Sequence, residues 1–212
     1  MECFKNKILA YEEKYNDLTY IARNGKLPII LTAVHTMMQL KPNDEYKYAE
    51  PYTKAIAMYV AENIDCFYLI KNKDTGFDSN SIENDTFKSM LLDNIKDNNI
   101  KLVIDLHGAK RERNFDVELG TLNNLSSDYS TIKELIDSFN ENGIFNVEIN
   151  NPFKGGGITQ KIFSETDCDV IQIEINYNFR NIEDSKKIEQ VTNSLISFIE
   201  QYNRIINNDT CD

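Results

Sequence analysis

The stretch Lys101-Leu102-Val103-Ile104-Asp105-Leu106-His107-Gly108 decides the fold that we expect for this chain. Its run of strand-forming apolar residues stops abruptly at a histidine and a glycine, which is typical of a buried parallel strand that brings a reactive side chain to a sheet edge. Two further runs have the same form. The run 27–34 ends at His35, and the run 169–176 carries Glu174 near its end. We therefore expect two imidazoles and a carboxylate to converge at one sheet edge, as in a metal hydrolase.

The bulk composition indicates a folded, soluble protein. A length of 212 residues suits one α/β domain, because single cores remain stable up to about 250 residues. Hydrophobic residues make up 41% and charged residues 27% of the chain, and both values are ordinary for globular proteins. No apolar segment approaches the roughly 18 residues that suggest a membrane span. We expect a single domain over residues 1–212 that does not act at a membrane.

Charge and cysteine usage exclude several function classes. A net charge of −11 argues against nucleic acid as a partner, because phosphate binding needs clustered Lys and Arg. The N-terminus lacks the apolar core of a secretory signal, so we expect a cytoplasmic protein. The cysteines are scattered without a Cys-x-x-Cys pair, which favours reduced thiols over a disulfide framework or a cysteine zinc site. They are Cys3, Cys66, Cys168 and Cys211.

The first third of the chain predicts a hairpin and then a helix. Asn24-Gly25 separates the apolar runs 18–22 and 27–34, and both residues tolerate the positive φ angles of a type I′ turn, so we expect these strands to pair antiparallel. Pro51 is expected to mark the start of a helix that continues to Asn63, with Glu50 just before it. Residues 66–70 are expected to form the next strand.

The remaining elements predict an α/β/α arrangement around a mixed, mostly parallel sheet. A surface loop is expected over 72–82, and a crossover helix over 83–98 completes a βαβ unit with the Lys101 strand. The alternation in 114–119 predicts a strand with one wet face. Further expectations are a helix over 128–142 closed by Gly143, a strand within 144–149, a ligand-approaching loop at the glycines 155–157, and a long helix from 183 to about 207.

The two histidines supply two ligands of a hydrolytic zinc site, which takes three protein ligands and leaves a fourth position for water. The alternative is that each is an ordinary structural histidine. The residues leave the third ligand open among four acidic side chains. Asp105 shares a strand face with His107 and could instead orient that imidazole, as carboxylates commonly do. The candidates are Asp44, Glu45, Glu50 and Asp105.

Glu174 is the candidate general base. It lies in an otherwise apolar run, and a buried carboxylate is costly unless it meets a cation, a metal or a hydrogen-bond donor. Partial desolvation would raise its pKa toward the working range of a base. The alternative is an ion pair with a lysine of a covering helix. Four cations near these motifs predict a substrate with a carboxylate, which arginine binds in bidentate fashion: Arg111, Arg113, Lys154 and Arg180.

Taken in order, five motifs resemble the N-formylglutamate amidohydrolase family of zinc hydrolases. They are Ala33-Val34-His35, Glu50-Pro51-Tyr52-Thr53, Asp105 to Gly108 followed by Arg113 to Thr121, Asn151 to Gly156, and Gln172 to Asn176. The resemblance implies a carboxypeptidase/phosphorylase-hydrolase-like fold with zinc on His35, Glu50 and His107. It also implies Glu174 as the base, Arg113 as a catalytic cation, and Lys154, Arg180 and Thr121 as substrate-binding residues.

We therefore predict a zinc-dependent amidohydrolase that hydrolyses a linear amide bond. The expected substrate is a small N-acyl amino acid resembling N-formylglutamate, or a γ-linked peptide with a free carboxylate. The leading alternative is a non-catalytic protein of the same fold that binds a carboxylated small ligand. A cysteine hydrolase served by one of the histidines is a third, more distant possibility.

Overall fold

The computed structural model describes residues 2–41 and 43–208, which form three layers with a seven-stranded sheet in the middle. The sheet order is β1-β5-β2-β6-β9-β7-β8, and the central strands β5, β2, β6 and β9 are parallel. A separate two-stranded hairpin joins β3 to β4. The strands are β1 (Tyr20–Arg23), β2 (Leu27–Ala33), β3 (Gln39–Leu40), β4 (Tyr46–Lys47), β5 (Cys66–Lys71), β6 (Leu102–Ala109), β7 (Val117–Gly120), β8 (Val147–Ile149) and β9 (Asp169–Asn176).

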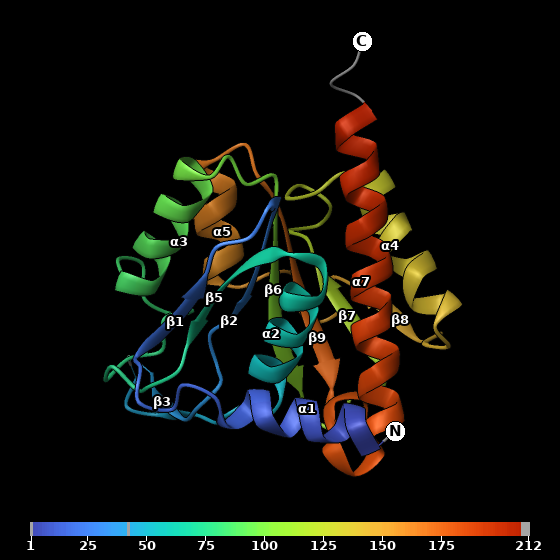
Figure 1. Ribbon diagram of the computed structural model, residues 1–212. Coiled ribbons are helices and arrows are strands. Elements are labelled where there is room, and N and C mark those ends of the chain that lie inside the picture. The colour runs from blue at the N-terminus through green and yellow to red at the C-terminus, as the bar shows by residue number, and fades with distance from the viewer. Residues whose placement is uncertain (1, 42, 209–212) are drawn as a thin grey trace.

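Helices cover both faces of the sheet (Figure 1). One face packs against α1 (Glu2–Glu13), α2 (Thr53–Ile64), α4 (Tyr129–Glu141) and α7 (Ser185–Asn208). The other packs against α3 (Thr86–Asp97) and α5 (Gly157–Glu165). The short helices α6 (Tyr177–Arg180) and η1 (Ile182–Asp184) connect β9 to α7. The predicted three-layer α/β/α class with a mixed, mostly parallel sheet is therefore confirmed.

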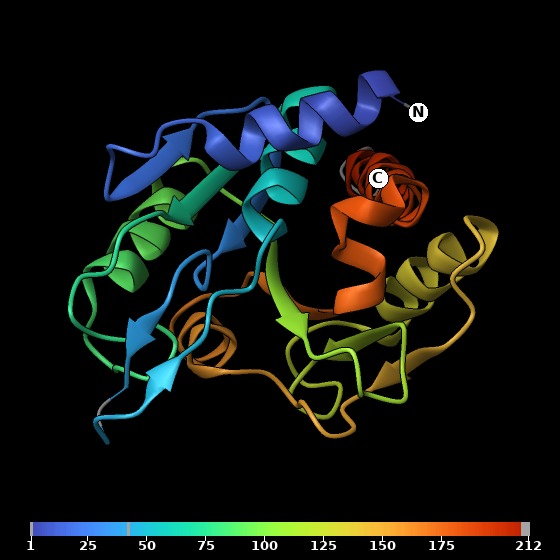
Figure 2. The ribbon, with the colours of Figure 1, turned by 90° about the horizontal axis from the view of Figure 1, so that it is seen from below.

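Strand alternation gives the two sheet faces different chemistry. The face toward α2, α4 and α7 is apolar along its length, as at Leu102, Ile104 and Leu106 of β6. On the opposite face β6 begins with Val103 and continues with Asp105 and His107. The helices α3 and α5 bury the apolar beginnings of these strands. The polar residues that follow are thereby gathered at the carboxyl ends, which point down in Figure 1 and toward the viewer in Figure 2.

Most local predictions are confirmed. The strands at 66–70, 102–108 and 169–176 are β5, β6 and β9, and the crossover helix is α3. The long C-terminal helix is α7. Gly143 has a positive φ of 81° immediately after the Asn142 cap of α4, as expected for a helix C′ residue.

The predicted hairpin at Asn24-Gly25 is wrong. β1 pairs with β5, and β5 lies between β1 and β2. Neither turn residue has a positive φ. The segment instead crosses the beginning of β5, where a Cβ on Gly25 would lie 2.2 Å from the backbone carbon of Cys66. Gly25 therefore permits a close crossing rather than a tight turn.

Three other local predictions need correction. The helix α2 begins at Thr53 rather than at Pro51, because Tyr52 takes a left-handed conformation with φ 69° and breaks the helical path. β7 has no wet face, since all four of its residues are buried and β9 and β8 pair with it on both sides. Helices α1 and α5 were not predicted. Their apolar residues are few, and the glycines before α5 resemble a loop.

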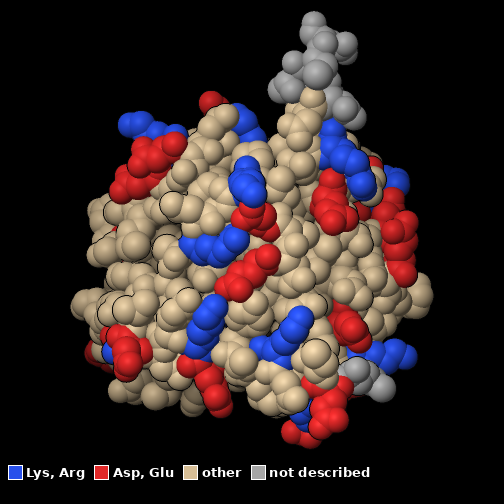
Figure 3. Space-filling view, in the orientation of Figure 1, with Lys and Arg blue, Asp and Glu red and all other residues tan. Residues whose placement is uncertain are grey.

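Two surface properties bear on possible partners. No helix among residues 2–41 and 43–208 is long and apolar enough to cross a membrane. On the face shown in Figure 3, basic side chains are interspersed with acidic ones and do not form one continuous basic patch. This distribution agrees with the net charge of −11.

Candidate metal centre and active site

Register places the candidate residues in one row on the sheet face toward α3 and α5. His107 on β6 pairs with Glu174 on β9, and Glu174 pairs with Glu118 on β7. One step earlier on the same face, Thr32 pairs with Asp105 and Asp105 pairs with Gln172. These side chains project in the same direction because paired residues of adjacent strands share a face.

His35, Glu50 and His107 form a buried cluster whose donor atoms lie within 4.8 Å of one another. The two imidazoles approach through Nδ1, at 3.0 Å. The Glu50 carboxylate spans both rings, with Oε1 3.3 Å from His35 Nδ1 and Oε2 3.4 Å from His107 Nδ1. Glu50 is held there because its backbone N–H donates to the His35 carbonyl and its Oε2 accepts from Gly108 N–H. The structure therefore unites the two predicted histidines with Glu50.

The outer nitrogen of each imidazole is held by an aspartate. His107 Nε2 lies 2.8 Å from Asp105 Oδ2, and His35 Nε2 lies 2.8 Å from Asp78 Oδ1. An ionised carboxylate only accepts hydrogen bonds, so each Nε2 carries the proton and each Nδ1 directs a lone pair toward the other ring. Two acceptors at 3.0 Å repel unless a proton or a metal cation lies between them.

The ionisation of the cluster follows from this arrangement. Burial opposes charge on His107, but Asp105 and Glu50 outweigh it and raise the pKa of its imidazole well above the ordinary value. Burial likewise opposes ionisation of Glu50, yet the two imidazoles hold the pKa of its carboxyl well below its usual range. The cluster thus retains one positive charge between the rings in the absence of metal. A metal cation would replace that proton on binding.

The residues fit zinc. Two imidazole nitrogens and one carboxylate are a common ligand set of catalytic zinc, and each imidazole has the carboxylate partner that usually orients a metal-binding histidine. The Nδ1 separation of 3.0 Å is close to the roughly 3.3 Å that separates neighbouring ligands in a tetrahedral zinc site. Glu50 Oε1 is buried and, among the described residues, has no hydrogen-bond donor of good geometry. The Lys47 ammonium lies 2.6 Å from this oxygen, and a metal cation would give it a further partner.

Glu174 is a further buried carboxylate, beside His107 in the sheet. Gln172 Nε2 donates to Glu174 Oε1 at 3.0 Å, and Gly156 N–H donates to Gln172 Oε1 at 2.7 Å, which fixes the orientation of the amide. Burial and the nearby charge of Glu50 raise the pKa of the Glu174 carboxyl. A carboxylate with a raised pKa beside a candidate metal site has the properties of a general base.

The glycines 155–157 approach protein atoms, which corrects the expected close approach to a ligand. A Cβ on Gly156 would lie 2.4 Å from Asn80 Nδ2, and one on Gly157 would lie 2.0 Å from Asn80 O. Gly157 already begins α5, whose Ile158 N–H donates to Asn80 Oδ1. The glycines therefore let the loop carrying Asp78 and Asn80 pack against the segment that holds Gln172.

The remaining candidates lie in different environments. Arg113 and Lys154 are exposed, and Arg113 stacks over the Phe153 ring at 4.9 Å. Arg180 is buried and donates to the carbonyls of Ile175, Pro51 and Ala109, so its guanidinium joins three segments around the site. Thr121 is also buried, and its hydroxyl donates to Asn124 Oδ1 and accepts from Nδ2 of Asn150, which follows β8.

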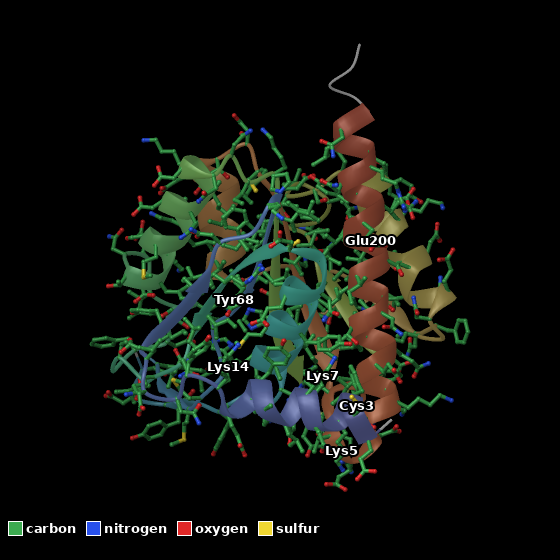
Figure 4. All side chains as sticks on the ribbon, in the orientation of Figure 1. Cys3, Lys5, Lys7, Lys14, Tyr68 and Glu200 are labelled. Carbon is green, nitrogen blue, oxygen red and sulfur yellow. The ribbon has the colours of Figure 1, made fainter. Side chains whose placement is uncertain are left out.

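Other residues from the sequence lie outside the cluster. Asp44 and Glu45 are exposed on the turn between β3 and β4. Burial raises the pKa of Cys66 and Cys168 to about 12, so these thiols hold little thiolate near neutral pH. Cys3 is exposed on α1, where Figure 4 labels it. Cys211 lies outside the described residues.

Sequence reasoning missed Asp78 and Lys47. Asp78 belongs to a polar segment expected to be a surface loop, yet its side chain is buried against His35. Lys47 lies 2.6 Å from Glu50 Oε1 in an ion pair. The sequence signal for Lys47 is its position three residues before Glu50, which allows the two side chains to pair. For Asp78, no local pattern distinguishes it from Asp74 in the same segment.

Solved structures share the fold of this chain. The chain is similar to a protein provisionally described as a carboxypeptidase A from Shewanella denitrificans OS-217, with a TM-score of 0.53, 13% identity, and coverage of 94% of this chain and 69% of that one. Sequence identities of this size show the fold alone. The carboxypeptidase-like fold that the sequence resemblance implied is therefore confirmed.

Part of the sequence matches a known family. Residues 88–179 match the N-formylglutamate amidohydrolase family, which confirms the resemblance over a span that includes His107, Arg113 and Glu174. The match indicates an amidohydrolase. His35 and Glu50 lie outside the matched span. No curated protein matches this chain.

Two further solved structures share the fold. One is N-formylglutamate amidohydrolase from Ralstonia eutropha JMP134, with a TM-score of 0.66, 13% identity, and coverage of 88% of this chain and 98% of that one. The other is a bacteriophage poly-γ-glutamate hydrolase, with a TM-score of 0.56, 15% identity, and coverage of 89% and 91%.

Proposed function

We propose that this chain is a zinc-dependent amidohydrolase that cleaves a small N-acyl amino acid resembling N-formylglutamate, or a γ-linked peptide. The observation that carries the proposal is the pair of imidazoles whose Nδ1 atoms lie 3.0 Å apart, each fixed at Nε2 by an aspartate and both bridged by Glu50. The match of residues 88–179 to an amidohydrolase family supports the reaction class.

His35, Glu50 and His107 would hold the metal. Zinc, when bound there, supplies a Lewis acid that polarises the amide carbonyl and lowers the pKa of water. Asp78 and Asp105 keep both imidazoles in the tautomer that offers Nδ1 as a ligand. The near-complete burial of the cluster strengthens these electrostatic interactions, because little water screens them.

Glu174 carries the proton. Its carboxylate takes a proton from the attacking water as the new C–O bond forms, and it gives that proton to the leaving nitrogen as the C–N bond breaks. Gln172 occupies Oε1, which leaves Oε2 for the proton. Arg113 and Lys154 are exposed, so both can bind a substrate carboxylate.

An activity screen tests the proposal. Purified protein should hydrolyse one or more members of a panel of N-acyl amino acids and γ-glutamyl peptides, and a chelator should abolish turnover until zinc is restored. Glu174→Gln should keep its zinc and lose hydrolysis by about 10²- to 10⁴-fold, whereas Glu165→Gln on the far end of α5 should behave as the unchanged protein. Full turnover by Glu174→Gln would refute its role. Ligand-dependent thermal stabilisation without any hydrolysis would favour the binding-protein alternative.

A further inference from the structure

The hairpin of β3 and β4 places a lysine over the candidate metal centre. Lys47 on β4 pairs in register with Gln39 on β3. Gln39 is buried, donates to the Val34 carbonyl and accepts from Lys71 Nζ, so the hairpin is anchored directly beside Lys47. Alternation then turns Tyr46 and Tyr48 outward, where they are 57% and 74% exposed. Lys47 is thus directed inward by a fixed backbone.

The ammonium of Lys47 lies at the solvent side of the ligand set. Nζ is 2.6 Å from Glu50 Oε1, and the Lys47 side chain is 30% exposed while that of Glu50 is 4% exposed. The lysine therefore contacts the candidate ligand Glu50 and is the more exposed member of this ion pair.

The other cations near the site have different partners. Arg180 donates to three backbone carbonyls. Lys71 donates to Gln39, to Ser79 and to the Phe77 carbonyl and is fully buried. Arg113 stacks on Phe153 at the surface. Lys47 alone among these four cations contacts a carboxylate of the candidate metal centre.

We propose that Lys47 is a catalytic residue that stabilises the oxyanion of the tetrahedral intermediate. As water attacks the carbonyl carbon, Glu174 takes the water proton and the carbonyl π electrons move to oxygen, which becomes negatively charged. Lys47 donates a hydrogen bond to this oxygen and keeps its proton. The electron pair then returns, the C–N bond breaks, and Glu174 protonates the leaving nitrogen. This proposal rests on the proposed function and assigns to Lys47 the role that the family resemblance implies for Arg113.

Kinetics of three variants test the proposal. Lys47→Met should lower kcat by about 10²- to 10³-fold with little change in KM, because the lost hydrogen bond forms mainly in the transition state. Lys47→Arg should recover part of that loss. The matched control is Lys41→Met, which removes a lysine of the same hairpin that forms an ion pair with Glu45. Zinc affinity, measured by titration with the metal alone, should be the same within twofold in all three. Unchanged kcat in Lys47→Met, or a loss of zinc that accounts for its lower kcat, would overturn the proposal.

Binding of inorganic phosphate to the zinc-loaded protein gives a readout that needs no turnover. Phosphate presents tetrahedral anionic oxygens, so Lys47→Met should weaken its binding by about tenfold, the effect of losing one charge-assisted hydrogen bond, and Lys41→Met should not. If the unchanged protein hydrolyses nothing but shows this Lys47-dependent binding, the amidohydrolase assignment fails while Lys47 remains the ligand of a tetrahedral oxyanion. Phosphate binding that is equal in all variants would overturn the role of Lys47.

Discussion

His107 and His35 meet through equivalent atoms but are supported in different ways. His107 lies within β6, and its aspartate, Asp105, is two residues earlier on the same strand, where Thr32 donates to it at 2.6 Å. His35 lies two residues beyond the end of β2, and its aspartate, Asp78, comes from the segment between β5 and α3. One half of the site is thus built into the sheet, whereas the other half is assembled by a loop.

The loop-borne half depends on buried lysines. Lys71 Nζ donates to the Phe77 carbonyl and to Ser79 Oγ, so it contacts the residues on both sides of Asp78. Lys88 Nζ donates to the carbonyl of Ile82 further along the same segment. Burial lowers the pKa of both lysines. This difference teaches that strand alternation places a metal ligand and its supporting aspartate side by side, whereas a loop needs buried tertiary contacts to bring an aspartate to its histidine.

The largest effect is expected at the strand-borne aspartate. Asp105→Asn would place an amide N–H₂ against either Thr32 or His107. Facing Thr32, it meets a hydroxyl that donates in the unchanged protein; facing His107, it moves the imidazole proton to Nδ1, which faces the metal. Zinc affinity should fall by about 10- to 100-fold, and the free energy of unfolding should fall by about 1 to 3 kcal/mol because Asp105 is fully buried. Chelator competition and urea unfolding measure the two quantities. A variant with native affinity and stability would contradict the support assigned to Asp105.

The equivalent change at the loop-borne aspartate, Asp78, should lower zinc affinity more than it lowers the stability of the fold. Asp78→Asn should also weaken zinc binding by about tenfold, with a smaller loss of stability because Asp78 lies outside the sheet. Although burial opposes its ionisation, His35 and Ser81 hold the pKa of Asp78 below its usual value. Its stabilisation is therefore complete above about pH 4 and is lost as the pH falls further. Urea unfolding should show that the unchanged protein and Asp78→Asn differ less in free energy of unfolding as the pH falls through this range. A difference that widens in acid would contradict the stabilising role of the Asp78 carboxylate.

A smaller effect on zinc affinity is expected at Lys71, which contacts the residues on both sides of Asp78. Lys71→Met should loosen the segment around Asp78 and reduce zinc affinity by about threefold, less than the loss of a direct partner. Lys54→Met is the matched control, because Lys54 is also buried and donates to neutral acceptors. These are the backbone carbonyl of Lys14 and the side-chain amide oxygens of Asn16 and Asn72. The free energy of unfolding, measured in urea, should fall by a similar amount in both variants. Only Lys71→Met should change the ¹⁵N chemical shifts of the His35 ring nitrogens. Equal spectra of His35 in the two variants would remove the proposed link.

The sequence predicts the strand-borne half well, because strand alternation is a local property. The apolar runs that carry His107 and Glu174 near their ends predict β6 and β9, and the shared face of Asp105 and His107 follows from their spacing of two. The carboxylate ligand was different. Four acids remained open, and Glu50 was preferred through the family resemblance; only the folded chain separates it from the exposed Asp44 and Glu45.

The loop-borne half of the site and the strand order could not be predicted from the sequence, because both depend on contacts between distant segments. His35 and Asp78 are 43 positions apart, and Asp78 looks like any acid in a polar loop. The predicted hairpin at Asn24-Gly25 failed for the same reason, since the insertion of β5 between β1 and β2 is a property of the whole sheet. Glycines 155–157 indicate a close approach, but the sequence does not tell whether a ligand or Asn80 is the neighbour.

A zinc titration of the metal-free protein tests the central claim most directly. The chain has only two histidines, so the double variant His35→Ala, His107→Ala removes both imidazoles from the candidate site at once. Isothermal titration should find one zinc bound per chain in the unchanged protein and none in the double variant, with circular dichroism showing that both are folded. Equal zinc binding by the two proteins, or no binding by the unchanged one, would contradict the metal centre described here.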